Sequence, residues 1–358
     1  MKIGVDISWM VGQYRGMGHF GRQLIAPISD QVVALAPKGI STTDWQCISR
    51  GLSFFPWWEQ IELPRLCRSE QLDYLLCPYN TGPIRSVGST QVIAVIHDLI
   101  YLQPFSIMPP STSYYQTFGR LYRRYVVPAF VQRADTIVTV SDFTKRALVE
   151  QFGLAEENIH IIPNTIEDIW FEQPLPLNSR KPYFFSVAGE SPSKNIHGLL
   201  KGFALALTKL QSNVKLKIAG VKHDYQDSFK KLATELGVAN NVEFLGFISL
   251  RELRQHYREA QAFVFASLFE GFGIPLLEAM ASGTPVACSN TSSMPEVVGK
   301  CALMFDPSSI EDIARALRII WQDTPEREIL TNEALDRALG FSESVVSQTI
   351  SAFWRELL

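Results

Sequence analysis

Apolar runs of strand length alternate with stretches of helical periodicity along the chain. In the first half, runs rich in Val, Ile and Leu predict strands at KIGVDIS, QVVALAP, LDYLLCP, QVIAVIHDL and DTIVTVS. Helical spacing predicts helices near residues 18–29, 113–133 and 142–151. This alternation is typical of parallel sheets with helices on both faces.

The second half repeats the pattern. Strands are predicted at PYFFSVAG, KLKIAG, NVEFLG, AFVFAS, TPVACS and ALMFDP. Helices are predicted near 195–211, 225–236, 250–259, 275–282 and 308–322. Two of these helices begin with a capping-box pattern, Ser249 with Glu252 and Ser308 with Glu311. The chain is therefore expected to contain two doubly wound α/β regions.

A proline-rich, polar segment separates the two regions. At 358 residues the chain exceeds the size at which a single core usually stops growing. The segment IIPNTIEDIWFEQPLPLNSRKPYFF suits a linker between domains. We expect an N-terminal domain over 1–170, a linker over 171–182, a C-terminal domain over 183–340, and a helix over 341–358 that packs back on the N-terminal domain.

Composition excludes several classes of protein. A formal net charge of −3 gives no general attraction to nucleic acid. The five cysteines are scattered and lack C-x-x-C spacing, which argues against a disulfide framework or a zinc site and favours a reducing compartment. The sequence begins with a strand pattern rather than a signal peptide, and no apolar run is long enough to span a bilayer. We therefore expect a cytoplasmic protein.

The string SLFEGFGIPLLEAMASGTP, residues 267–285, carries the strongest chemical signal. Glu270 falls on a glycine-containing loop after a predicted strand, and Glu278 falls inside the following helix. Backbone N–H groups at such a glycine-flanked helix start bind phosphate well. Two carboxylates beside a phosphate site suit a ligand with hydroxyl groups next to its phosphates, such as a nucleotide sugar. The alternative is a capped loop that carries two acids by chance.

Further polar residues follow other predicted strands. His97 ends the strand QVIAVI, where parallel sheets bind ligands, although a lone histidine is often structural. Gly16 and Gly18 follow the first strand and allow close approach to a phosphate or an acceptor, a weak signal alone. Possible acceptor contacts at such strand ends are Arg15, His19 and Asn80. Asp98 and Ser141 are expected to cap the segments that follow them.

With these motifs in view, the chain resembles the retaining glycosyltransferases of family 4, which have the GT-B fold. The likeness covers nearly the whole length and is strongest over residues 242–299. Shorter matches are RGMGHFGRQLI, VIHDLIY, VSDFTKRAL and IHIIPNTI. The segments WEQIELP and CPYNTGP resemble the mannosyltransferase B-like branch of that family.

The resemblance implies roles for these residues. Glu278 would accept hydrogen bonds from the ribose hydroxyls, and Glu270 would lie near the donor sugar. Lys194 would contact the diphosphate, and His97 would reach the donor sugar or the transferring centre. The expected catalytic residues are His97, Lys194 and Glu270. The expected donor-binding residues are Gly16, Gly18, Lys194, Phe272, Gly273, Ile274 and Glu278.

The loop that contains Lys194 departs from the family pattern. Many members carry an arginine near the lysine of the phosphate loop, but here Gly189 and Ser193 stand at those places and Glu190 lies close by. Diphosphate binding would then depend on Lys194, with backbone N–H groups or the hydroxyls of Ser191 and Ser193 in place of the arginine. The alternatives are that another basic residue takes its place or that activity is weak.

The resemblance implies transfer of a sugar, with mannose as the first guess, from a nucleotide-diphosphate sugar with retention at the anomeric carbon. The acceptor would be a glycan, a lipid-linked glycan or a small molecule, in a pathway such as cell-surface polysaccharide synthesis. No D-x-D string occurs, so we expect neither a metal nor another cofactor. Two alternatives stay open: a nucleotide-sugar epimerase of the same fold, and an inactive nucleotide-sugar sensor or scaffold.

Two segments suit a membrane surface. FFPWW at 54–58 is densely aromatic, and TFGRLYRRYVVPAF at 117–130 carries three arginines among apolar residues. Aromatic and basic side chains together are typical of peripheral contact with a bilayer, here its inner face. The alternative is a core cluster and a helix that packs within the protein. The sequence predicts no oligomeric state.

Overall fold

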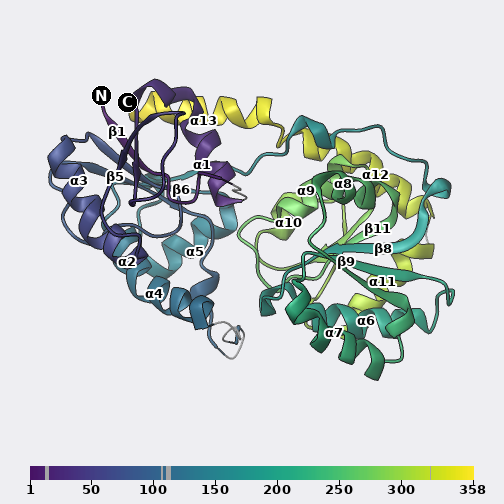
Figure 1. The fold of residues 1–358 in the computed structure, drawn as a ribbon. Coiled ribbons are helices and arrows are strands. Elements are labelled where there is room, and N and C mark those ends of the chain that lie inside the picture. Colours follow the sequence, from purple (N-terminus) through teal and green to yellow (C-terminus); the bar gives the residue numbers. More distant parts are fainter. Residues whose placement is uncertain (13–15, 106–107, 110–113, 323) are drawn as a thin grey trace. The chain divides into compact units, whose positions relative to one another are not determined.

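Each half of the chain folds around its own parallel sheet (Figure 1). The computed structural model describes residues 1–358 except 13–15, 106–107, 110–113 and 323. Unit 1 comprises Met1–Pro104, Thr112–Asn164 and Val346–Leu358, and unit 2 comprises Phe105–Ser111 and Thr165–Val345. Apart from Phe105–Ser111, the chain passes from unit 1 to unit 2 after Asn164 and returns to unit 1 at Val346.

The sheet of unit 1 has seven parallel strands in the order β3-β2-β1-β4-β5-β6-β7. All five strands predicted in the first half are present. The additional strands, β3 and β7, occupy the two edges. The strands are β1 Ile3–Asp6, β2 Val32–Ala36, β3 Gln46–Ser49, β4 Tyr74–Cys77, β5 Gln91–Ile96, β6 Thr136–Thr139 and β7 Ile159–Ile161.

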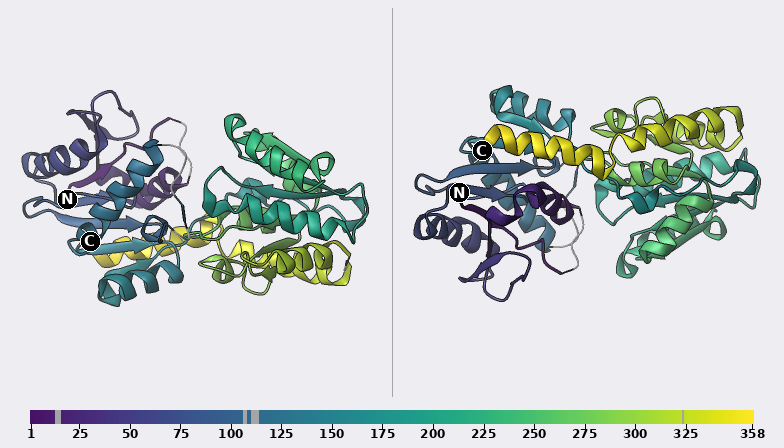
Figure 2. Two further views of the ribbon diagram at one scale, coloured as in Figure 1. Left: turned by 90° about the horizontal axis from the view of Figure 1, so that it is seen from below. Right: turned by 90° about the horizontal axis from the view of Figure 1, so that it is seen from above.

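Helices cover both faces of this sheet. They are α1 Met17–Ile25, α2 Phe55–Trp57, α3 Leu63–Glu70, α4 Tyr114–Val131, α5 Asp142–Phe152 and α13 Glu343–Leu357. One core contains the fully buried Leu75, Ile96 and Phe130, so α4 seals one face. The C-terminal helix α13 lies along unit 1 (Figure 2), where the Trp354 indole N–H donates to the Leu24 carbonyl at 2.6 Å. This bond anchors the end of the chain beside α1.

The sheet of unit 2 has six parallel strands in the order β10-β9-β8-β11-β12-β13. The strands are β8 Lys181–Val187, β9 Lys215–Ala219, β10 Val242–Gly246, β11 Ala260–Phe265, β12 Val286–Ser289 and β13 Leu303–Phe305. All six match the predicted runs. Because the chain winds outward in both directions from the β8–β11 pair, the topological switch point lies between these two strands.

The helices of unit 2 lie on two faces (Figure 1). On one face α6 Ile196–Leu207, α7 His223–Glu235 and α11 Ile310–Gln322 enclose a core that includes Phe184, Phe203 and Leu317. On the other lie α8 Leu250–Glu259, α9 Ile274–Ala281 and α12 Thr324–Leu339. The short α10 Met294–Val298 packs against α9. Among the described helices, none is both long and apolar enough to cross a membrane.

The local caps agree with the sequence at one helix and differ at another. The capping box of Ser249 and Glu252 is present at the start of α8, so that prediction is confirmed. The predicted box of Ser308 and Glu311 is wrong. The Asp306 carboxylate accepts both the N–H and the hydroxyl of Ser308, at 2.8 and 2.6 Å. The helix therefore starts later, and Ser309 caps it by accepting the Asp312 N–H at 3.1 Å.

Candidate active site

The loops after β8 and β11 meet at the switch point of unit 2. The Leu268 N–H donates to the Ser193 carbonyl at 2.7 Å, which ties one loop to the other. Lys194 ends a short 3-10 turn, Pro192–Lys194, and Glu270 lies on the loop before α9. In parallel sheets the carboxyl edge at a switch point is where ligands bind. The two predicted residues are thus placed at the expected edge.

Lys194 and Glu270 form an ion pair. The Lys194 Nζ donates to Glu270 Oε1 at 2.6 Å, with side chains 27% and 15% exposed. The ammonium group also lies 5.4 Å from the centroid of the Phe265 ring at the end of β11. Each charge therefore has a partner in this structure, and the pair is only partly accessible.

Two serines that the sequence reasoning missed shape the glycine loop. The Ser293 hydroxyl donates to the carbonyls of Glu270 and Phe272 at 3.0 and 2.9 Å. The Ser292 hydroxyl accepts the N–H of Glu270 at 3.0 Å. Both serines follow β12, and polar residues at a strand end were the available signal. Together these bonds tie the loop that carries Glu270 and Phe272 to the residues after β12.

The start of α9 presents backbone donors. Gly273 has a φ of +111° and directly precedes the helix, a conformation that favours glycine. Within the described residues, no acceptor meets the N–H groups of Phe272, Gly273 or Ile274. The Phe272 ring is buried against Phe341 at 5.7 Å between centroids. The helix dipole adds partial positive charge at this point, which suits an anion.

Glu278 lies one turn inside α9 and is oriented by a second element. The Tyr257 hydroxyl of α8 donates to Glu278 Oε2 at 2.7 Å. Tyr257 is fully buried, and burial followed by the negative charge of Glu278 holds its pKa well above the usual range. The tyrosine stays protonated and remains a donor, so it fixes the direction of the carboxylate.

In unit 1, His97 and Asn80 are brought together after β5 and β4. The Asn80 amide oxygen accepts the backbone N–H of His97 at 2.5 Å, and His97 Nε2 lies 3.0 Å from the Pro78 carbonyl. Burial lowers the pKa of His97 to about 4, against a smaller raising effect of the bond to Pro78. The imidazole is therefore neutral near pH 7, with Nε2 as the donor in that bond and Nδ1 an acceptor.

The first strand of unit 1 ends beside this pair. Gly16 precedes α1 with a φ of +52°, Gly18 is buried in the first turn, and His19 follows it half-buried. The ring of Phe20 from the same turn packs on His97 at 5.1 Å. Arg15 lies outside the described residues. The Asp98 carboxylate accepts the Ile100 N–H, and Ser141 caps α5, which confirms both expected capping roles.

A buried carboxyl in unit 1 was also missed. Glu59 lies in a π-helical turn, Trp58–Glu62, and is 1% exposed. It accepts hydrogen bonds from the Tyr122 hydroxyl at 2.5 Å and the Gln60 amide at 2.9 Å. Burial raises the pKa of Glu59 to about 7, because these bonds offset only part of the desolvation. The WEQ motif thus places a carboxyl that titrates near neutral pH beneath the unit 1 surface.

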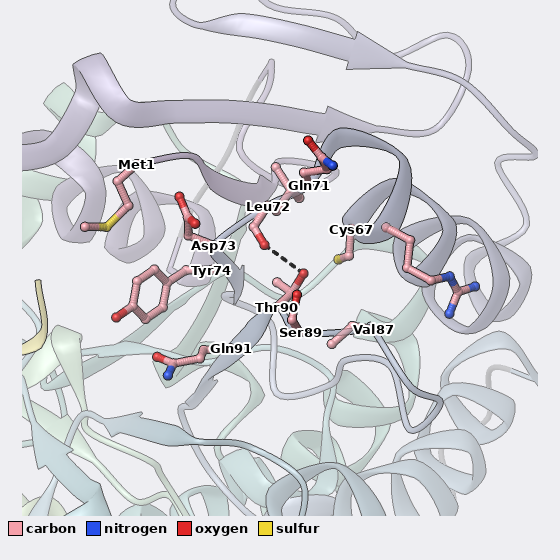
Figure 3. Close-up of a pocket in the computed structure, with 12 residues that line it drawn as sticks. Met1, Cys67, Gln71, Leu72, Asp73, Tyr74, Val87, Ser89, Thr90 and Gln91 are labelled. Atoms are coloured by element: carbon pink, nitrogen blue, oxygen red, sulfur yellow. Dashed lines mark hydrogen bonds between the residues drawn. The ribbon is translucent and has the colours of Figure 1, made fainter.

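A cavity of about 860 Å³ lies at the other edge of the unit 1 sheet (Figure 3). Met1, Tyr74 and Gln91 line it at the amino-terminal ends of their strands, and the Thr90 hydroxyl donates to the Leu72 carbonyl at 2.9 Å. None of the predicted site residues lines this cavity. Across the described residues, no three His, Cys, Asp or Glu side chains converge as metal ligands.

Two family models match successive parts of the chain. The model "Glycosyltransferase Family 4" matches residues 23–168, and "Glycosyl transferases group 1" matches residues 169–337. O-antigen chain mannosyltransferase B of Escherichia coli is 32% identical over 62% of this chain and 60% of its own length. O-antigen chain mannosyltransferase RfbU of Salmonella typhimurium is 29% identical over 66% of each. The chain therefore aligns with somewhat less than two thirds of these relatives.

Solved structures share the fold. HepE from Anabaena, solved in complex with UDP, superposes with a TM-score of 0.76 over 99% of this chain and 100% of its own, at 17% identity. At that identity the likeness shows the architecture alone, which is the two-domain GT-B fold. The predicted fold class is confirmed.

Proposed function

We propose that this chain, which belongs to the family 4 glycosyltransferases, transfers a hexose from a nucleotide-diphosphate sugar to a hydroxyl of an acceptor glycan. The observation that carries the proposal is the Lys194–Glu270 pair at the switch point of unit 2, beside the open N–H groups of α9. Mannose is the proposed sugar, since two of the relatives at about 30% identity are named as mannosyltransferases.

Different residues of unit 2 would bind different parts of the nucleotide-sugar donor. The start of α9 and Lys194 would bind the diphosphate, and Glu278, held by Tyr257, would accept hydrogen bonds from the ribose. In this proposal Lys194 exchanges Glu270 for a phosphate. Glu270 is then free to orient hydroxyls of the sugar, so one movement would prepare both groups.

In the proposed step, the bond between the anomeric carbon and the diphosphate oxygen breaks, and the leaving group keeps the electron pair. The acceptor oxygen attacks from the same face, and its proton passes to the leaving phosphate. Lys194 and the α9 N–H groups stabilise the charge that develops on the leaving group, a contribution of a few kcal/mol for each well-placed donor. We propose that neither a metal nor an enzyme nucleophile takes part, and that neutral His97 takes part in ligand binding on unit 1.

Thermal-shift measurements with GDP, UDP and dTDP and their hexose conjugates test the donor. We expect the nucleotides with one particular base to raise the melting temperature, and we expect that base to be guanine. Proton NMR of the product tests the anomeric configuration, and turnover in excess EDTA tests the metal-free step. Failure of every nucleotide to stabilise the protein would contradict the proposed function. An inverted product, or activity abolished by EDTA and restored by Mg²⁺, would contradict the mechanism only.

A further inference from the structure

Unit 1 also has an aromatic groove, and none of the predicted site residues lines it. It has a volume of about 460 Å³ and is lined mainly by Trp9, Phe54, Phe55, Phe118, Tyr122 and Arg123. Trp9 comes from the loop after β1, Phe55 from α2 and Tyr122 from α4. A concave, largely apolar pocket of this size with a few polar groups is typical of a small-ligand site.

The groove opens at the same sheet edge as His97 and Asn80. Trp9 follows the carboxyl end of β1, and its backbone N–H donates to the hydroxyl of Tyr79 at 3.1 Å. Tyr79 in turn follows β4 and directly precedes Asn80. The helix α4 begins after β5, so its early residues also lie toward this edge. A ligand in the groove would therefore lie at the ligand-binding edge of unit 1.

The rings in the groove contact one another edge to face and do not stack. The centroids of Trp9 and Phe55 are 6.4 Å apart with planes at 73°, and those of Phe55 and Tyr122 are 6.0 Å apart at 74°. Trp9 is 42% exposed despite its size. An aromatic face carries partial negative charge and attracts the C–H groups on one side of a pyranose ring.

Two of the polar groups that line the groove, the Trp9 indole and the Arg123 guanidinium, are hydrogen-bond donors. Within the described residues, no acceptor meets the indole N–H of Trp9 or the guanidinium of Arg123. Both groups can only donate. Their neighbours on α4, Arg120 and Arg124, instead donate to backbone carbonyls between Tyr101 and Gln103. A ligand that suits the groove thus combines an apolar ring face with several acceptor oxygens.

The helix itself makes room for Arg123. Gly119 interrupts α4, where glycine costs stability, and a Cβ there would come within 3.2 Å of Arg123 Nη1. Side chains on a helix point toward its N-terminus, over the residue four positions earlier. Gly119 therefore allows the guanidinium to lie across the helix surface at the groove.

Glu59 fixes the wall behind the groove. It holds the Tyr122 hydroxyl, while the Gln60 amide donates to the Gly82 carbonyl at 3.1 Å and its oxygen accepts the Ile84 N–H at 3.0 Å. The WEQ segment is thereby joined to the loop that contains Thr81 and Gly82. These partly buried bonds position the ring of Tyr122 and hold the Glu59 carboxyl below the surface.

We propose that this groove binds a saccharide unit of the acceptor. The sugar ring would pack against Trp9, Phe55 and Tyr122, and its oxygens would accept hydrogen bonds from the Trp9 indole N–H and the Arg123 guanidinium. The inference rests on the proposed function, because it takes the acceptor to be a glycan. A lipid chain fits less well, since it would leave both donors without acceptors. Trp9 and Arg123 are then specificity-determining residues for the acceptor.

Saturation-transfer NMR with the full chain tests this inference. The probes are methyl α-D-mannopyranoside and α-linked mannobiose and mannotriose, each added with saturating GDP. We expect transfer to the sugar protons in the wild type, and at least tenfold weaker binding in Trp9→Ala and Arg123→Ala. Tyr125→Ala is the matched control, since Tyr125 is 75% exposed on the same helix and does not line the groove.

The outcomes separate this inference from the proposed function. Trp9→Phe keeps the ring without the N–H, so an intermediate loss with an unchanged melting temperature would support the stated contacts. Saccharide signals that persist in both alanine variants, or no signal from any saccharide while GDP binds, would overturn the inference. So would binding to phosphatidylcholine–phosphatidylglycerol vesicles that the same two variants abolish, with saccharide binding unchanged. Absence of GDP binding would count against the donor assignment instead.

Discussion

The Lys194–Glu270 ion pair sets the charge balance of the donor site. The pair is 2.6 Å apart and partly buried, so in the proposed donor site a diphosphate would compete with the Glu270 carboxylate for the same ammonium group. A buried pair contributes less than its Coulomb energy suggests, because both groups lose hydration. Its proposed role is to keep Lys194 in position until an anion replaces the carboxylate.

Glu270→Gln therefore separates binding from transfer. We expect the nucleoside diphosphate to bind at least as tightly as to the wild type, because Lys194 no longer has a charged competitor. We expect sugar transfer to fall by about 10²-fold, because the carboxylate no longer orients the sugar. Calorimetry and steady-state kinetics measure the two effects. The matched control is Glu259→Gln, which breaks the exposed pair with Lys181 at 2.6 Å. Weaker nucleotide binding in Glu270→Gln alone would contradict this account.

Glu59 and His97 respond to pH in opposite directions. Burial raises the pKa of Glu59 to about 7, so the folded state binds more protons than the unfolded state between about pH 4.5 and 7. The free energy of unfolding then decreases as the pH rises through that window. Burial lowers the pKa of His97 to about 4, so its contribution increases between about pH 4 and 6.5. The two effects largely offset each other.

Glu59→Gln should remove the effect of Glu59 on the pH dependence of the unfolding free energy, so that the effect of His97 is seen alone. Relative to the wild type, we expect the variant to gain roughly 3 kcal/mol of unfolding free energy between pH 4.5 and pH 8, because a tenfold change in proton affinity corresponds to about 1.4 kcal/mol. Urea unfolding at a series of pH values measures this difference. Glu157→Gln, at an exposed glutamate of unit 1, is the control. Parallel pH curves for Glu59→Gln and the wild type would show that Glu59 is not protonated near neutral pH.

At the scale of elements, the sequence predicts the strands and helices whose hydrophobic periodicity is strong. The eleven predicted strands are all present, since long apolar runs belong to strands buried on both faces. The missed strands β3 and β7 are short edge strands with few apolar residues, QCIS and IHI. The helix α12 was missed because its periodicity is weak across residues 324–339. Edges and weakly amphipathic helices depend on their neighbours, which a local pattern does not show.

The candidate site also contains residues that the sequence predicts and residues that it does not. Glu270, Glu278 and Lys194 follow strands, and their motifs placed them at the right edge. Ser292, Ser293 and Tyr257 act through hydrogen bonds across 21 to 23 positions of sequence. Such contacts depend on tertiary folding, so the position of the two serines after β12 was the only signal for them, and nothing in the chain pattern pointed to Tyr257. Lys194 still lacks the companion arginine of the family pattern, and the proposal gives its part in diphosphate binding to the N–H groups of α9.

The glycine in α4 links helix stability to the aromatic groove. Gly119→Ala should stabilise the helix by up to about 1 kcal/mol, because alanine has the higher helix propensity. The new Cβ would displace the Arg123 guanidinium, since 3.2 Å is too close for an unchanged side chain. We therefore expect a higher melting temperature together with saccharide binding that is several-fold weaker.

A double-mutant cycle provides the control for this prediction. In an Arg123→Ala background, Gly119→Ala should still raise the melting temperature but cause no further loss of saccharide binding, because the displaced group is absent. An equal loss in both backgrounds would show that Gly119 acts without Arg123.

At the scale of the whole molecule, each unit presents a complete parallel sheet with its own switch point. Unit 2 carries the charged and backbone donors proposed for the nucleotide, and unit 1 carries His97 and the aromatic groove. The helix α13 returns the end of the chain to unit 1 through the Trp354 bond to Leu24. The two family models divide the chain close to the same point, at residues 168 and 169. Donor and acceptor recognition are therefore proposed as separate tasks of separate units.

Calorimetric titration of GDP and UDP into the wild type, Glu278→Ala and Glu235→Ala tests the central claim most directly. Glu278 is held by Tyr257 toward the proposed ribose site, whereas Glu235 is an exposed acid at the end of α7. Loss of a charged hydrogen-bond acceptor costs about 1.5–3 kcal/mol, so Glu278→Ala should weaken the preferred nucleotide by at least tenfold. Glu235→Ala should bind like the wild type. Equal affinity in Glu278→Ala, or no binding of either nucleotide to the wild type, would contradict the account.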